Sequence, residues 1–245
     1  MFNSLPIQLR HEQIYLKELQ IGQIIEMAKI PQELNELRMN SFLAYTCQDD
    51  SIAMRLTVQE RYYILLNYLA ISNNDYMINT DVSEFFIKAK TAPDMASVNG
   101  VYVSQLLGSH AILLQSKCEN IYEWLAGKIA CQLSGDLTHF FGDEQNPVIW
   151  EHLPTDNQDT LENVFRSRFE MINRLTDSLF SQLTDIYYQG CEKLRHLVDI
   201  SVDNDGITLL GNSQNQGGGD IHIARFRPTT ALSDISKRLS QLIAE

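Results

Sequence analysis

The sequence predicts an α+β protein that is predominantly α-helical, with a helical N-terminal domain, a long helix, and a small C-terminal β-hairpin with a terminal helix. Three observations predict this class. Apolar residues recur at helical spacing through most of residues 22–133 and again over 159–198. The dipeptide Asp205-Gly206 lies between two β-type runs, which is a strong hairpin signal. With 245 residues, 44% of them hydrophobic and 20% charged, the chain can bury a large core.

The N-terminal elements follow from short local patterns. Ile7 and Leu9 alternate with polar residues, as in a short strand near Pro6, whereas residues 10–21 fit either a strand or a helix. Residues 22–30 predict a short helix that stops before Pro31. Pro31 suits the first turn of the next helix, over about 31–47, because proline lacks an N–H that this turn would leave unpaired.

The clearest local signal is the capping box Thr57-Val58-Gln59-Glu60, in which the hydroxyl and the carboxylate satisfy free N–H groups at a helix start. The residues that follow, to about Leu69, are apolar nearly all round, so this helix is predicted to be central and buried. Residues 76–100 remain ambiguous between strand and helix. A second helical region is predicted over about 109–133.

An acidic segment comes next. No Lys or Arg lies between Lys128 and Arg166, and prolines and glycine interrupt the chain there; the acidic residues of this interval are Asp136, Asp143, Glu144, Glu151, Asp156, Asp159 and Glu162. This composition predicts a connector over 141–158. The predicted division is therefore a helical domain at 1–140, the acidic connector at 141–158, and a long helix with hairpin and C-terminal helix at 159–245.

The long helix, over about 159–198, carries the predicted partner-binding residues. A helix of about forty residues would be about 60 Å long, which outruns one small domain. Its apolar stripe therefore has two interpretations, packing in its own core or contact with another subunit, and Gly190 interrupts it near the end. The candidate partner-binding residues are Leu161, Phe165, Phe169, Ile172, Leu175, Leu179, Leu183 and Ile186 of the stripe, with Arg225 and Arg227 on a predicted strand at 220–227.

No residue pattern predicts a catalytic, cofactor or metal site. His110, Cys118, Cys131 and His139 have zinc-ligand identities, but residues eight apart on one helix lie about 12 Å apart. Residues 203–206 resemble part of a calcium loop, without its closing bidentate carboxylate. The chain lacks the G-x-S-x-G nucleophile motif, and no GK[ST] follows the glycines at 217–219. We therefore expect no enzyme and no cofactor, with an unidentified enzyme as a remaining alternative.

Charge and composition limit the partners. The chain has 19 Lys and Arg against 31 Asp and Glu, for a formal net charge of −12, which disfavours nucleic acid and anionic membrane surfaces. It predicts instead a basic surface on a protein partner that meets the two acidic segments, which are the connector and residues 196–224. The N-terminus has no signal-peptide pattern and no stretch is apolar enough to span a membrane, so we expect a cytoplasmic protein with its four cysteines reduced.

Residues 1–90 resemble a known family. The resemblance rests on the short strand near Pro6, the helices at 22–30 and 31–47, and Leu56-Thr57 followed by Gln59-Glu60-Arg61-Tyr62-Tyr63-Ile64-Leu65-Leu66. This arrangement resembles the baseplate-hub assembly chaperones of contractile-tailed bacteriophages. Members often continue into a paired-cysteine segment, which this chain lacks, so the resemblance implies no zinc role here.

The resemblance implies a non-catalytic function. The protein would bind tail or baseplate subunits during virion assembly, in the host cytoplasm, or would remain in the virion as a structural baseplate component. Self-association through the long helix is also compatible with it. The alternative function is a regulatory protein-binding module of a host or mobile element.

Overall fold

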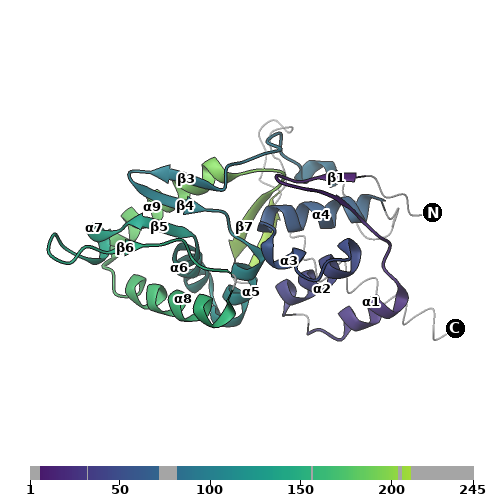
Figure 1. Cartoon of the computed structure of the whole chain (residues 1–245), viewed down its shortest axis with the longest axis horizontal. Helices are drawn as coiled ribbons and strands as arrows, with labels where there is room; N and C mark the ends of the chain where they lie inside the picture. Colours follow the sequence, from purple (N-terminus) through teal and green to yellow (C-terminus); the bar gives the residue numbers. More distant parts are fainter. Residues whose placement is uncertain (1–5, 32, 72–81, 156, 204–205, 211–245) are drawn as a thin grey trace. The chain divides into compact units, whose positions relative to one another are not determined.

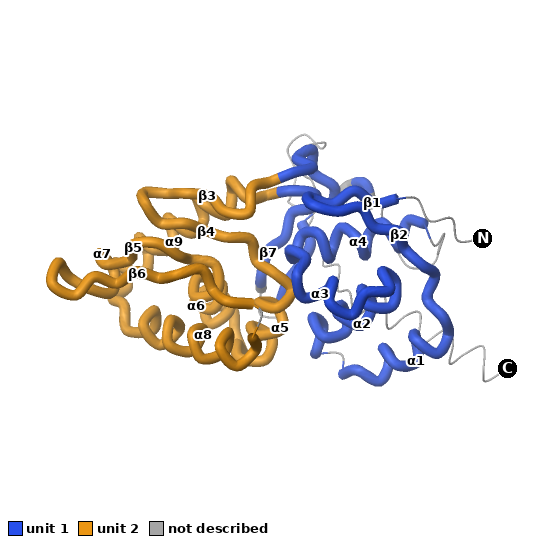
Figure 2. The backbone as a smooth tube through the Cα atoms, viewed as in Figure 1, with its two compact units in different colours: residues 1–91, 196–245 blue, residues 92–195 orange. Residues whose placement is uncertain are grey.

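A computed structural model describes residues 6–31, 33–71, 82–155, 157–203 and 206–210 (Figure 1). The protein is α+β and predominantly helical, as predicted. The chain forms two compact units, and Figure 2 shows them in two colours. Unit 1 comprises Met1–Thr91 and His196–Glu245, and unit 2 comprises Ala92–Arg195. Unit 2 is therefore an insertion in the sequence of unit 1, which differs from the predicted boundaries at 140 and 159.

Unit 1 combines two small hairpins with a group of helices. Strand β1 (Pro6–Gln8) pairs antiparallel with β2 (Gln13–Tyr15), so the ambiguous segment 10–21 contains a strand. The helical elements of this unit are α1 (Ile21–Ala28), α2 (Asn35–Cys47), α3 (Ile52–Arg55), α4 (Val58–Ile71) and the short 3-10 helix η1 (Val82–Phe85). The helices predicted at 22–30, 31–47 and 57–71 are thus present, with the second starting four residues later than Pro31.

The capping box at the start of α4 is confirmed. The Thr57 N–H donates to Glu60 Oε2 at 2.9 Å, and the Glu60 N–H donates to Thr57 Oγ1 at 3.1 Å. Both N–H groups would otherwise be unpaired in the first helical turn. The helix that follows is central, because Tyr62, Ile64 and Leu65 are fully buried.

The C-terminal hairpin is also confirmed. Strand β7 (Asp199–Asp203) pairs antiparallel with β8 (Gly206–Leu210), and the register ends with Asp203 opposite Gly206. The hairpin returns to unit 1, where the Tyr62 hydroxyl donates to the carbonyl of Ile207. The predicted strand at 220–227, with Arg225 and Arg227, and the predicted terminal helix lie outside the described residues.

Unit 2 is built on an antiparallel sheet in the order β3–β4–β5–β6. Its strands are β3 (Met95–Val98), β4 (Val101–Ser104), β5 (Leu133–Asp136) and β6 (Ile149–Trp150). Asn99 and Gly100, both at positive φ, form the two-residue turn between β3 and β4, which matches the twist of a hairpin. Ala96, Val103 and Leu133 are aligned across three strands and buried, which defines the inner face of the sheet.

The two long helical patterns are each divided, which corrects the sequence prediction. Residues 109–133 form α5 (Gly108–Lys117) and α6 (Ile121–Gln132), while 159–198 contain α8 (Gln158–Ile172) and α9 (Asp177–Leu194). The side chains of Asn120 and Thr176 accept N–H groups at the new helix starts. The apolar spacing continues across these caps, so periodicity alone did not separate the helices. At 18 residues, α9 is about 27 Å long.

The acidic segment predicted as a connector is part of unit 2. It contributes β6, and α7 (Thr138–Phe141) precedes it. Trp150 of β6 stacks on Phe141, with ring centroids 5.0 Å apart. A two-residue strand is too short to show an alternating pattern. The prolines and charges around it therefore led to the prediction of a connector.

Candidate functional site

The predicted apolar stripe faces the interior of unit 2. Four of its residues (Leu161, Phe165, Ile172 and Leu183) are buried, and four (Phe169, Leu175, Leu179 and Ile186) are half-buried. None of the eight is exposed. The placement of the four buried residues matches the core-packing interpretation, while the four half-buried residues keep part of their surface exposed, so their contact with a partner stays a prediction.

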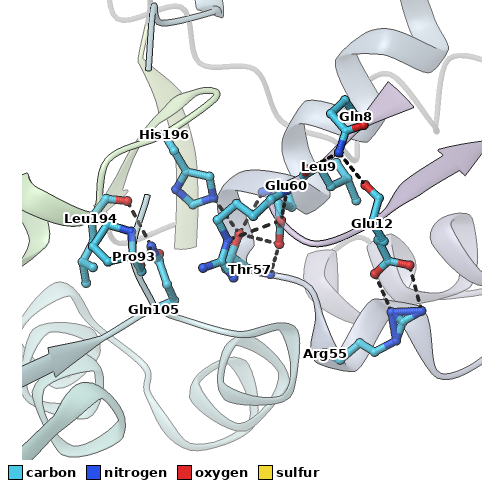
Figure 3. Close-up of polar contacts among 11 residues, drawn as sticks. Gln8, Leu9, Glu12, Arg55, Thr57, Glu60, Pro93, Gln105, Leu194 and His196 are labelled. Carbon is cyan, nitrogen blue, oxygen red and sulfur yellow. Dashed lines mark hydrogen bonds and ion pairs between the residues drawn. The ribbon is translucent and has the colours of Figure 1, made fainter. Parts of the chain in front are cut away.

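A buried polar network lies at the start of α4 in unit 1 (Figure 3). Glu60 Oε1 accepts the backbone N–H of Arg10 and lies 3.4 Å from its Nε. Thr57 Oγ1 lies 3.0 Å from Glu60 Oε2 and 3.2 Å from His196 Nε2. The network therefore ties the turn after β1, the start of α4 and the returning segment at His196. Nothing in the sequence indicated that Arg10 and His196 belong to this network. The contact between Thr57 and His196, for example, joins residues that are 139 positions apart.

The hydroxyl, imidazole and carboxylate of this network are the groups that a nucleophilic enzyme would use. Thr57, Glu60 and His196 are, however, 0%, 3% and 0% exposed. A catalytic group must reach a substrate, so this network acts as a structural tie. In unit 2 the Gln105 amide has a comparable role, since Nε2 donates to the carbonyls of Pro93 and Leu194 and joins the first and last segments of the unit (Figure 3).

A second polar cluster joins α6 and α9. Lys128 Nζ lies 5.7 Å from the centre of the Tyr187 ring, and burial lowers the pKa of this lysine. Burial raises the pKa of the neighbouring Cys191 thiol, which keeps it protonated and poorly nucleophilic at neutral pH. The other thiols are similar, since burial raises the pKa of Cys47 to about 11 and that of Cys118 to about 12. All four cysteines are free thiols.

His110, near the start of α5, is a buried titratable group in unit 2. Its Nδ1 accepts the backbone N–H of Leu107 at 3.3 Å, and its Nε2 has no hydrogen-bond partner among the described residues. Burial, helped by the charges of His152 and Arg168, lowers the pKa of this imidazole from 6.5 to about 3.

We expect this histidine to make stability depend on pH. Between pH 6.5 and pH 3 the unfolded chain binds a proton at His110 that the folded chain does not bind, so the free energy of unfolding falls as the pH falls. From pH 8 to pH 5 the loss is about 2 kcal/mol. His110→Gln retains an acceptor for the Leu107 N–H and should remove this pH-dependent loss of stability. Urea titrations at pH 8 and pH 5 measure the loss. His139 is exposed, so His139→Gln is the control and should lose as much stability between pH 8 and pH 5 as the wild type does. An equal loss in His110→Gln would contradict the assignment of this pH dependence to His110.

The feature of unit 2 best suited to binding is the side of its sheet opposite to the inner face. On this side of β3, β4 and β6, Met95, Tyr102 and Ile149 are 47%, 45% and 61% exposed, whereas Ser104, opposite Met95, is buried. The register aligns Ser97, Tyr102 and Ser134 across three strands and places Asp136 opposite Ile149. We call this surface the outer sheet face; its exposed residues are Met95, Ser97, Tyr102, Asp136 and Ile149, whereas Ser134 between them is buried.

The aromatic ring of Tyr102, at the centre of the outer sheet face, lies against the backbone at Gly135. Gly135 has φ of +99°, and a Cβ built on it would lie 3.1 Å from Tyr102 Cδ2 and 2.9 Å from the Gly100 carbonyl oxygen. The Tyr102 ring thus rests where residue 135 has no side chain. An aromatic ring that is already positioned loses little conformational entropy on binding.

Comparisons with known proteins add no family. No protein-family model matches the chain, and neither the curated proteins nor the solved structures include a significant match. Within the described ranges, no three or more His, Cys, Asp or Glu side chains are placed to hold a metal ion. The helices of the same residues include none of the length and apolarity that crossing a membrane requires.

Proposed function

We propose that the protein is a non-catalytic assembly protein of a contractile phage tail, acting as a baseplate assembly chaperone or as a structural baseplate component through contacts with other subunits. The observation that carries the proposal is the exposure of large apolar side chains on regular secondary structure in both units. Tyr102 and Ile149 are exposed in unit 2, and Ile21 and Ile25 of α1 are exposed in unit 1. Apolar side chains gathered on ordered elements are typical of protein-binding surfaces.

The resemblance of residues 1–90 is the reason for naming phage tails. The elements that carry it belong to one compact unit, which makes a shared binding module a coherent proposal. In that unit α1 has only Met27 buried, while its isoleucines are exposed or half-buried. A short apolar helix of this kind offers a partner an accessible surface.

The test is a phage that carries an amber mutation in the gene for this chain. In a host that does not suppress the mutation, we expect electron microscopy to show lysates without complete baseplates or tails. Mass spectrometry of purified wild-type virions then separates the two forms of the proposal, because a component is present in the particle and a chaperone is absent. Normal tails and normal titres from the amber mutant would contradict both forms.

A further inference from the structure

We propose that the outer sheet face of unit 2 binds a basic, amphipathic segment of another protein subunit, an inference that rests on the proposed function and specifies its partner. The apolar side chains of the site are the exposed Met95, Tyr102 and Ile149 on β3, β4 and β6, and β5 contributes only polar residues between Tyr102 and Ile149. Tyrosines at such positions contribute strongly to binding because they bury a large area at a small cost in conformational entropy.

One carboxylate lies on the β5–β6 side of this face, and two more belong to the adjoining loop. Asp136 lies opposite Ile149 on the same face, and the exposed Asp143 and Glu144 lie in the loop that leads to β6. We call Asp136, Asp143 and Glu144 the acidic rim. Asp136 and Asp143 accept backbone N–H groups from Thr138, Gln145 and Asn146.

Asp136 and Asp143 of the acidic rim are ionised at neutral pH, and the rim has no nearby basic residue along the chain. The hydrogen bonds to their carboxylates lower the pKa values of Asp136 and Asp143. No Lys or Arg occurs between Lys128 and Arg166, and unit 2 as a whole has twice as many Asp and Glu as Lys and Arg. Arg168, moreover, is buried and donates to the carbonyls of Ala130 and Leu133. The face therefore combines exposed apolar side chains with a negative border on its β5–β6 side, while Lys193 donates to the Ser97 carbonyl on β3.

This charge pattern selects the partner. Lys or Arg side chains beside aliphatic ones would meet the acidic rim and the exposed apolar side chains together. A second copy of this chain, docked through the same face, would bring the two acidic rims toward each other, which disfavours a symmetric dimer. Phosphate surfaces, whether of nucleic acid or of lipid, would be repelled.

The test uses the purified full-length protein and two labelled synthetic peptides. One peptide alternates lysine with leucine, and the other has glutamate in place of each lysine. We expect fluorescence anisotropy to show binding of the lysine peptide only, and to show weaker binding as salt concentration rises. Absence of lysine-peptide binding, or equal binding of the glutamate peptide, would overturn the proposal.

Variants then locate the binding surface. Tyr102→Ser and Ile149→Thr, which change exposed side chains, should each weaken binding of the lysine peptide by about tenfold. Asp136→Asn combined with Asp143→Asn should weaken it and reduce its salt dependence. The matched controls are Tyr122→Ser on α6, where the tyrosine is 79% exposed, and Asp177→Asn at the start of α9.

The controls should bind as the wild type does, and circular dichroism should show that every variant is folded. Equal weakening by the control and test variants would contradict binding at this face. Light scattering that shows a wild-type dimer, dissociated by Tyr102→Ser, would replace the proposed partner with a second copy. Because peptide binding is measured on the isolated protein, its failure is separable from a negative result in the phage assembly test.

Discussion

Replacement of Arg61 by methionine is expected to lower the free energy of unfolding by about 3–5 kcal/mol, because it leaves a buried carboxylate without its charge partner. Arg61 of α4 and Glu36 of α2 are 0% and 2% exposed at their side chains, and Arg61 Nη2 lies 3.0 Å from Glu36 Oε2. The same Nη2 donates to the Glu36 carbonyl and to Asn40 Oδ1. Tyr62 donates its hydroxyl to Glu36 Oε1 at 3.1 Å.

The physical reason is the cost of a buried charge that has lost its ion-pair partner. Burial lowers the pKa of Arg61, and the charge of Glu36 acts in the opposite direction. When both charges are present, their attraction offsets part of the desolvation cost; when one is deleted, the other retains its full cost. Adding Glu36→Gln to the Arg61→Met variant removes the second charge and keeps an acceptor for Tyr62. This double variant should therefore be more stable than the single one.

Urea titrations followed by far-ultraviolet circular dichroism measure this effect. The control is Lys29→Met, which breaks the pair of Lys29 with Glu26, whose side chains are 64% and 57% exposed. That exposed pair should contribute no more than about 0.5 kcal/mol. A double variant as unstable as Arg61→Met alone would mean that lost packing, and not an unpaired charge, dominates.

The parts of the fold that the sequence predicted correctly are those that local chemistry determines. Thr57 and Glu60 are three residues apart and form the capping box by themselves, and the β-type runs on either side of the Asp205-Gly206 signal pair as β7 and β8. The breaks before α6 and α9 also have local caps, at Asn120 and Thr176. Continuous apolar spacing masked them, so the predicted helices were too long.

The candidate site could not be predicted because its residues come together only through non-local pairing. Met95 lies in a segment that fitted either strand or helix, and Ile149 lies in the presumed connector. Tyr102 between them becomes recognisable as a surface anchor only after β4 is paired on both sides. The absence of Lys and Arg from this region was visible in the sequence, but its position beside an apolar sheet face was not.

Gly190 shows how a single residue supports the inner face of the same sheet, and its replacement by alanine should lower the free energy of unfolding by about 2 kcal/mol or more. The sequence indicated that Gly190 interrupts the last long helix, whereas the structure places it inside α9, against β4. A Cβ at this position would lie 2.2 Å from Val103 Cγ2 and 2.6 Å from Val103 Cβ. Val103 is fully buried on a central strand, so its Cβ cannot move aside without the backbone.

The net effect of Gly190→Ala is a balance of two terms with opposite signs. Alanine favours a helix interior over glycine by about 1 kcal/mol, and the clash with Val103 must exceed that gain. Tryptophan fluorescence in urea isolates the effect in unit 2, because both tryptophans, Trp124 and Trp150, belong to it.

Gly22→Ala in α1 is the matched control, since nothing lies within 4 Å of its added Cβ; followed by far-ultraviolet circular dichroism, because α1 belongs to unit 1, it should raise stability by about 0.5–1 kcal/mol. Val103→Ala combined with Gly190→Ala removes the Cγ2 clash but leaves the Cβ contact. The double variant should therefore lose less stability than the two single losses added together. If Gly190→Ala behaved like Gly22→Ala, then α9 would not need glycine at this position to approach β4.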